Sequence, residues 1–108
     1  VEIMPILETI VCQTMKGKEA RFHRMVKART ELSKRQDGCI NSWYGVSNSD
    51  EFLYLIQTAY DDIDQFHNVK KLIEETLDVK DGGLESCLSG PPLLGLFEID
   101  KDALNLTK

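Results

Sequence analysis

Cysteine, proline and tryptophan are scarce in the 108-residue sequence, with three, three and one copies. The three cysteines, Cys12, Cys39 and Cys87, are odd in number and widely spaced, and no CxxC pair occurs. A disulfide framework and a zinc motif are therefore not expected. We interpret all three as reduced thiols that pack like small hydrophobic residues.

Basic residues and long apolar runs are also few. Thirteen Lys and Arg residues against eighteen Asp and Glu residues give a formal net charge of −5, and the basic residues form no stripe. No apolar run approaches the roughly 20 residues that span a bilayer, and no basic segment precedes a long apolar core near the N-terminus, as a secretory signal would require. We therefore expect a cytoplasmic protein with no nucleic-acid partner and no membrane partner.

The spacing of apolar residues predicts six elements in one domain that covers residues 1–108. The predicted strands cover residues 5–15, 40–46, 52–60 and 93–99, and the predicted helices run from about 19 to 36 and from about 61 to 77. This β-α-β-β-α-β order is the α+β, ferredoxin-like arrangement, an antiparallel sheet with both helices on one face. Residues 100–108 are polar enough to form a mobile end or an arm over a partner.

The predicted strands are apolar on both faces. In the first strand, Ile6, Ile10 and Cys12 alternate with Leu7, Val11 and Met15. Two helices cover only one face, and an open apolar face of several hundred Å² would promote aggregation of a monomer. The sequence therefore predicts a homodimer whose sheets pack face to face and enclose an apolar cleft in each subunit.

Three segments carry a family resemblance. Residues 16–19 (KGKE) open the first helix, residues 37–44 (DGCINSWY) end it and begin the next strand, and residues 47–57 (SNSDEFLYLIQ) form the hairpin. With Phe66-His67 in the second helix, this pattern resembles the antibiotic biosynthesis monooxygenase-like (ABM) family of dimeric α/β barrels. Tyr60 occupies the position of that family's usual Trp, and the first strand lacks an Asn, so haem degradation is not expected.

The resemblance implies a cofactor-independent monooxygenase that acts on a small aromatic or polyketide-like substrate. No phosphate loop, nucleophile elbow, triad or zinc motif occurs in the sequence, and we predict no cofactor. Two alternatives use the same dimeric scaffold. One is a non-catalytic small-ligand-binding or stress-response protein, and the other is an isomerase or cyclase.

His67 is the candidate catalytic base, because an imidazole titrates near neutral pH. Trp43 and Tyr44 occupy adjacent strand positions and point to opposite faces, so one of them faces the partner-covered side. Tyr54 and Tyr60 share a face and could orient a polar substrate through their hydroxyls. Each has an alternative: His67 caps the helix or packs beside Phe66 while partly exposed, Trp43 and Tyr44 pack in the core or at the dimer interface, and the two other tyrosines are buried with hydroxyls that bond to the backbone.

Two charged features have simpler explanations than a site. Arg29 lies on the apolar stripe of the first helix, so its guanidinium either reaches solvent or meets an acid. Asp61, Asp62 and Asp64 are explained by the preference of helix N-termini for negative charge, and we predict no metal site there.

Overall fold

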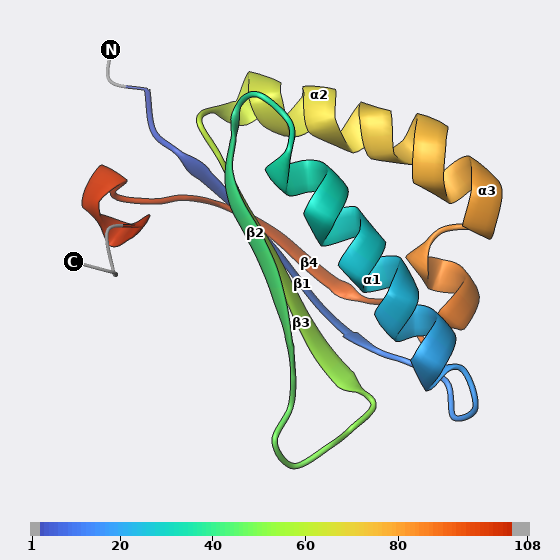
Figure 1. Cartoon of the computed structure of the whole chain (residues 1–108). Coiled ribbons are helices and arrows are strands. Elements are labelled where there is room, and N and C mark those ends of the chain that lie inside the picture. Colours follow the sequence, from blue (N-terminus) through green and yellow to red (C-terminus); the bar gives the residue numbers. More distant parts are fainter. Residues whose placement is uncertain (1–2, 105–108) are drawn as a thin grey trace.

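The computed structural model describes residues 3–104, and its strands form one antiparallel sheet with the helices packed on one face (Figure 1). The strand order across the sheet is β2-β3-β1-β4. This is the predicted ferredoxin-like α+β fold. The elements are β1 (Ile6–Gln13), α1 (Glu19–Lys34), β2 (Cys39–Val46), β3 (Leu53–Tyr60), α2 (Ile63–Ile73), the π-helix η1 (Glu74–Asp78), α3 (Val79–Asp81), the 3-10 helix η2 (Leu84–Cys87), β4 (Leu93–Glu98) and the 3-10 helix η3 (Lys101–Leu104).

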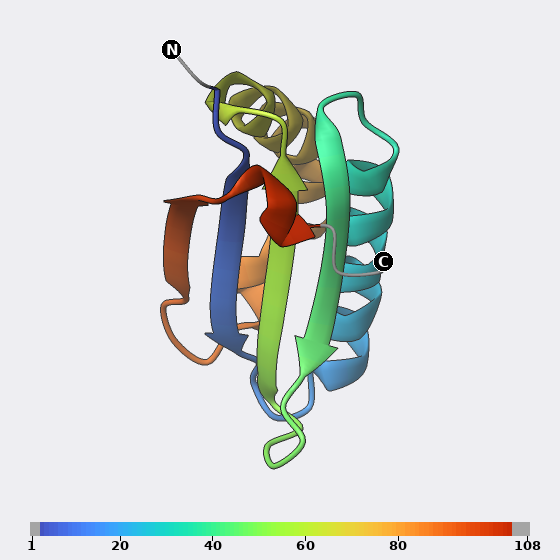
Figure 2. The ribbon, with the colours of Figure 1, turned by 90° about the vertical axis from the view of Figure 1, so that its left-hand side faces the viewer.

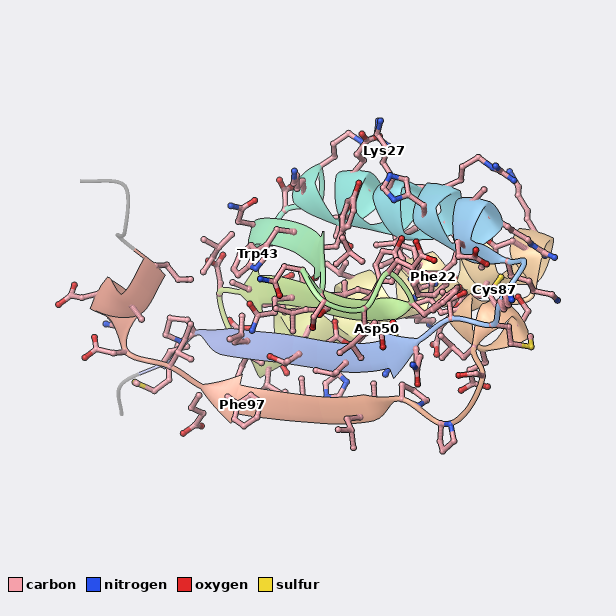
Figure 3. The ribbon with its side chains drawn as sticks, turned by 90° about the horizontal axis from the view of Figure 1, so that it is seen from below. Phe22, Lys27, Trp43, Asp50, Cys87 and Phe97 are labelled. Carbon is pink, nitrogen blue, oxygen red and sulfur yellow. The ribbon has the colours of Figure 1, made fainter. Side chains whose placement is uncertain are left out.

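Helix α1 forms where apolar residues recur at helical spacing. Phe22, Met25 and Val26 are buried against the sheet, and Figure 3 shows Phe22 between this helix and the strands. The chain then reverses at Gly38, whose φ of 87° lies in the left-handed region that glycine tolerates best. The sequence predicts an apolar stripe on this helix and a C-cap or turn at Asp37-Gly38, and both predictions are confirmed.

Helix α2 begins at the cap Asp62, whose carboxylate accepts a hydrogen bond from the backbone N–H of Gln65 at 3.0 Å. The helix does not stop at the predicted residue 77. It continues through the π-helix η1 and the short helix α3 as far as Asp81, where Gly82 with φ 82° ends it. The sequence pattern missed this extension because a π-turn shifts the apolar spacing away from the 3.6-residue period.

The core consists of two buried clusters on the helix side of the sheet. One cluster surrounds Phe22 and Tyr54 beneath α1, and the other surrounds Tyr60 and Phe66 beneath α2. The ring centroids of Phe22 and Tyr54 lie 4.9 Å apart, and those of Tyr60 and Phe66 lie 5.5 Å apart, both with edge-to-face geometry. The space between the two clusters is where the candidate site lies.

The opposite face of the sheet is open. The register places Thr9, Gln57 and Trp43 in one row across β1, β3 and β2. The indole N–H of Trp43 donates to the Gln57 side-chain oxygen at 3.0 Å, and the Gln57 amide donates to the Thr9 hydroxyl at 3.2 Å. Apolar side chains flank this polar row, including Leu55, Leu93 and Phe97, which are 37%, 73% and 53% exposed.

The segment after β4 returns across this open face. Figures 1 and 2 show η3 in front of the sheet on the side away from the helices. Of the predicted arm over residues 100–108, the part up to residue 104 thus crosses the chain's own sheet, and residues 105–108 lie outside the described residues. No helix within residues 3–104 is long and apolar enough to cross a membrane.

Candidate functional site

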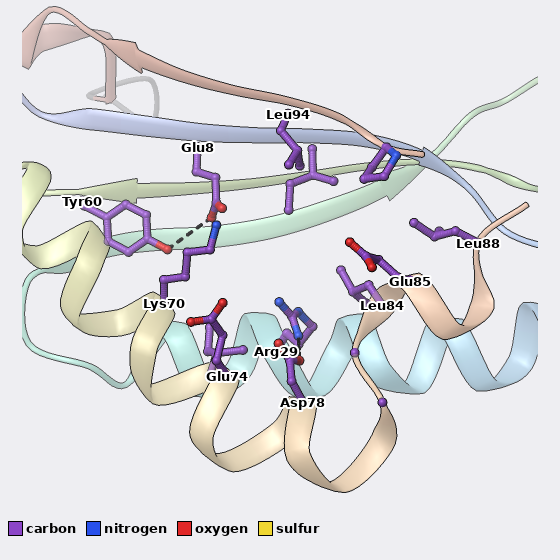
Figure 4. Close-up of a pocket in the computed structure, with 15 residues that line it drawn as sticks. Glu8, Arg29, Tyr60, Lys70, Glu74, Asp78, Leu84, Glu85, Leu88 and Leu94 are labelled. Carbon is purple, nitrogen blue, oxygen red and sulfur yellow. Dashed lines mark hydrogen bonds and ion pairs between the residues drawn. The ribbon is translucent and has the colours of Figure 1, made fainter. Parts of the chain in front are cut away.

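A cavity of about 380 Å³ separates the two core clusters (Figure 4). The sheet forms its floor, α1 and the α2–η1 helix form its sides, and the η2 region closes one end. Its size lies within the range of roughly 300–1,000 Å³ that is common for ligand pockets. It is lined by Glu8, Ile10, Arg29, Tyr60, Lys70, Ile73, Glu74, Asp78, Gly82, Gly83, Leu84, Glu85, Leu88, Pro92 and Leu94.

Glu8 is the carboxylate on the floor of this cavity. It lies on β1 between Ile6 and Ile10, at a position where the alternation of the strand points a side chain toward the helices. The Tyr60 hydroxyl donates a hydrogen bond to the Glu8 carboxylate at 3.3 Å. Burial raises the pKa of Glu8 above its ordinary value, while Lys70, the Tyr60 hydrogen bond and Arg29 act in the opposite direction.

Tyr60 and Lys70 surround this carboxylate. Tyr60 is 1% exposed, and its pKa is raised by burial first and by the neighbouring Glu8 charge second, so the phenol stays protonated and remains a donor. Figure 4 shows the side chains of Lys70 and Glu8 pointing toward one another from opposite sides of the cavity. Lys70 also lies over the ring of Phe66, with 5.4 Å between its Nζ atom and the ring centroid.

An ion pair joins α1 to the π-helix on the side of the cavity opposite the sheet. The Arg29 guanidinium contacts the Asp78 carboxylate, and their side chains are 20% and 26% exposed. Of the two predicted outcomes for Arg29, solvent exposure or pairing with an acid, the structure shows pairing with an acid. The pair fixes the position of the π-helix, which supplies both Glu74 and Asp78 to the cavity wall.

The cavity lining combines six charged side chains, Glu74 and Asp78 among them, with apolar side chains. A partly desolvated carboxylate whose pKa is raised holds a proton more tightly than an exposed one, and it can therefore act as a base closer to neutral pH. Lys70 supplies a positive charge beside it that would stabilise a developing anion. Ile10, Leu88 and Leu94 provide apolar surface on which a ring could pack.

Of the residues predicted from the sequence, Tyr60 lines the cavity and the others do not. Tyr44 lies beside α1, with its hydroxyl 3.4 Å from His23 Nε2. Tyr54 packs against Phe22 in the core. Trp43 belongs to the polar row on the open face. The structure therefore does not bring these aromatic residues together around one site.

His67 is exposed on α2 and is not among the residues that line the cavity. Within residues 3–104, the only aromatic ring that its imidazole contacts is that of the neighbouring Phe66. The contact is edge-to-face, and the two ring centroids lie 5.1 Å apart. The helical rotation of roughly 100° per residue explains its position, because Phe66 faces the core and the next residue faces outward. Within the same residues, no group of three or more His, Cys, Asp or Glu side chains could hold a metal ion.

Glu8 and Lys70 were the residues that sequence reasoning missed. A signal for Glu8 was present, since a glutamate between Ile6 and Ile10 is a charged residue in a series that faces the core. A charge at such a position needs a partner or a cavity. Lys70 carries a weaker signal, since it lies four residues after Phe66 and three before Ile73, at a position that the apolar stripe of this helix assigns to either Val69 or Lys70.

Comparison with solved structures shows the same fold in proteins with little sequence identity. A "Putative antibiotic biosynthesis monooxygenase" from Nitrosomonas europaea superposes with a TM-score of 0.76 at 12% identity, covering 94% of this chain and 95% of that one. A variant of SnoaB, a cofactor-independent oxygenase from Streptomyces nogalater, gives 0.72 at 16% identity, covering 93% and 96%. The chain has the fold of these oxygenases.

The same fold occurs in a protein that is described only as conserved. A conserved protein from Methanosarcina mazei gives a TM-score of 0.78 at 14% identity and covers 91% of this chain and 95% of that one. No family model and no curated protein matches the sequence. The shared fold thus supplies a scaffold, and the choice of chemistry depends on the residues in this chain's own cavity.

Proposed function

We propose that this protein is a cofactor-independent monooxygenase-like enzyme that acts on a small aromatic or polyketide-like substrate in the cavity around Glu8. The observation that carries the proposal is a half-buried carboxylate on the cavity floor, with a raised pKa, a phenol donor and a lysine beside it. The oxygenase fold of the solved structures supports the same reaction class.

In the proposed reaction, Glu8 removes a proton from an acidic C–H or O–H group of a phenolic or enolisable substrate. Lys70 stabilises the resulting anion, and Ile10, Leu88 and Leu94 provide the apolar surface on which the substrate packs. Dioxygen, the second substrate, then oxidises the anion. A CH₂ group becomes a carbonyl, one oxygen atom enters the product, and the other leaves as water with the two hydrogens of that group.

Glu8 takes the role that the sequence assigned to His67. The exposed position of His67 gives it no contact with the cavity, whereas Glu8 lies within it. Tyr60 stays in the proposal as the donor that orients the carboxylate.

The test is oxygen uptake with a panel of naphthols, anthrones and hydroquinones. Glu8→Gln should lower the turnover number by about 10²–10⁴-fold, the usual contribution of a general base. Glu75→Gln is the matched control, because Glu75 is exposed, pairs with Lys71 and does not line the cavity. His67→Ala distinguishes the two bases and should leave turnover within about twofold of wild type.

Full activity in Glu8→Gln, or loss of activity in His67→Ala alone, would contradict the assignment of the base. Saturable ligand binding by the wild-type protein without oxygen uptake across the panel would favour the non-catalytic ligand-binding protein.

We further propose that two copies of the chain pair through the open faces of their sheets to form a dimeric α/β barrel. The exposed apolar residues Leu55, Leu93 and Phe97 support this assembly, because a partner sheet would bury them. In sedimentation, wild type should run at twice the 12.3 kDa chain mass. Phe97→Asp should run as a monomer, whereas Val79→Asp, a change at an exposed α3 residue, should not. A monomeric wild type at micromolar concentration refutes the dimer.

A further inference from the structure

Positive charge is concentrated in one segment of this acidic protein. Of the thirteen Lys and Arg residues, eight lie within residues 16–35, together with only two of the eighteen acidic residues. This segment therefore has a formal charge of +6, and the rest of the chain, with five basic and sixteen acidic residues, has a formal charge of −11. Most of the segment forms helix α1.

The helical phase of α1 places these charges on its outer face. Arg24, Lys27 and Lys34 follow one another at spacings of three and seven residues, which places them on one side of a helix. That side is exposed and lies opposite the buried residues Phe22 and Val26, and Figure 3 shows Lys27 on the side of α1 away from the sheet. The basic face of α1 consists of the exposed residues Arg21, Arg24, Lys27, Lys34 and the C-cap Arg35. The expectation that the basic residues form no stripe is therefore wrong for this helix.

Contacts within the chain do not account for these charges. Within residues 3–104, no side chain of the basic face makes an ion pair with an acid. Lys34 and Arg35 lie at the C-terminal end of the helix, where a positive charge stabilises the helix dipole, but Arg24 and Lys27 lie in the middle, beyond the reach of that effect. Glu31 is the only exposed acidic residue of α1. Since neighbouring like charges repel one another, an anionic partner would stabilise this face.

We infer that the basic face of α1 binds an acidic segment of a partner protein. A net-acidic chain that concentrates its positive charge on one helix attracts anionic groups there and repels them elsewhere. The sixteen residues of α1 span about 24 Å, a length that about seven residues of extended chain match. No residue of the basic face lines the cavity around Glu8, and the open face of the sheet lies on the other side of the molecule. The surface is therefore free in the proposed dimer as well.

Two other anionic partners fit this surface less well. A helix that binds a bilayer surface buries large apolar side chains among the lipids, and the exposed apolar residues of α1 are only Ala20 and Ala28. A nucleic acid longer than the helix would continue over surface that carries the acidic majority of the chain. In addition, α1 exposes no Phe, Tyr or Trp on which a base could stack. A short acidic protein segment needs neither feature.

The experiment follows the fluorescence anisotropy of a labelled peptide of seven glutamates as the protein is added. A peptide of seven serines with the same label is the neutral probe. Wild type should bind the glutamate peptide, and raising the salt concentration from about 20 mM to about 200 mM should weaken this binding about tenfold, because salt screens exposed charges. The double variant Arg24→Gln/Lys27→Gln should weaken binding at low salt about fivefold, as expected for the loss of two exposed ion pairs. Glutamine has a high helix propensity, so both changes are compatible with the helix.

The double variant Lys71→Gln/Lys80→Gln is the matched control, because it removes the same amount of charge from exposed residues outside the basic face. It should keep the wild-type affinity within about twofold. No binding of the glutamate peptide by wild type, equal affinity for the serine peptide, or equal weakening by both double variants overturns the inference. Tighter binding of a DNA duplex of about 12 base pairs, or of vesicles with about 30% phosphatidylserine, that is lost in Arg24→Gln/Lys27→Gln would assign the face to a nucleic acid or a membrane and refute the acidic protein segment.

Discussion

The ion pair between Arg29 and Asp78 gives a sharp test of how the cavity is held together. It connects α1 to the π-helix across the cavity wall. Asp78→Asn removes the charge with little change in shape and leaves the Arg29 guanidinium without its counter-charge. Arg29→Gln makes the reverse change, and the double variant completes a thermodynamic cycle.

The expected loss in the free energy of unfolding follows from how exposed the two side chains are. Exposed ion pairs contribute about 0–1 kcal/mol, and breaking a fully buried pair costs about 3–5 kcal/mol. Side chains that are 20% and 26% exposed lie between these cases, so Asp78→Asn should lower the free energy of unfolding by about 2 kcal/mol. For a chain of this length, that loss corresponds to a decrease in Tm of about 8 °C.

The assay is urea and thermal unfolding of the four proteins, with the coupling energy taken from the cycle. We expect coupling of about 1–2 kcal/mol that decreases only slightly in high salt, because a partly buried pair is weakly screened. Lys71 and Glu75 form the control cycle, since this exposed pair at 3.9 Å on the outer face of the helix should give about 0.3–0.5 kcal/mol. Coupling for Arg29–Asp78 no larger than that of the control pair would show that this ion pair does not hold α1 to the π-helix.

Two further predictions concern stability. Because burial raises the pKa of Glu8 from 4.5, the native state binds this proton more tightly than the unfolded chain, and the contribution of Glu8 to stability falls as pH rises from 4.5 through the raised pKa. Glu8→Gln should therefore gain stability relative to wild type between pH 4 and pH 8 in urea unfolding, and a constant difference across that range would contradict this. Gly38→Ala should lower the free energy of unfolding by about 1–3 kcal/mol, because φ at this position is 87° and an added Cβ would lie 2.5 Å from the Gln65 side chain. Gly90→Ala, where nothing lies within 4 Å of the added atom, should change thermal stability little, and equal losses in the two variants would contradict the conformational argument.

The fold was predictable because its signals are local. The apolar stripe of α1, the turn at Gly38 and the cap at Asp62 each depend on a few neighbouring residues. The sequence predicts the stripe and the turn where they are found, and it predicts the cap at either Asp61 or Asp62. The α2 helix runs past its predicted end through a π-helix, whose residues per turn differ from the 3.6-residue period that the sequence pattern follows. The homodimer, the single-domain organisation and the cytoplasmic location stay predictions.

The candidate site was only partly predictable. Tyr60 was named from its strand position, and it does line the cavity. His67 was named from chemistry and family resemblance, and its helical phase places it outside. The residue type can suggest a catalytic base, but a shift of one residue along the helix decides whether the side chain faces a cavity or solvent.

The order of the elements, the two-faced apolar sheet and the charged residue within β1 can be inferred from the amino-acid pattern alone, because periodicity and composition are properties of neighbouring residues. Only the tertiary structure decided that Glu8, Tyr60, Lys70 and the Arg29–Asp78 pair surround one cavity. These side chains come from β1, β3, α1 and the α2–η1 helix, and they meet because the packing of the helices over the sheet leaves a gap between two core clusters. Such a gap results from how side-chain volumes fit together across the whole domain. It therefore cannot be inferred from the pattern of neighbouring residues.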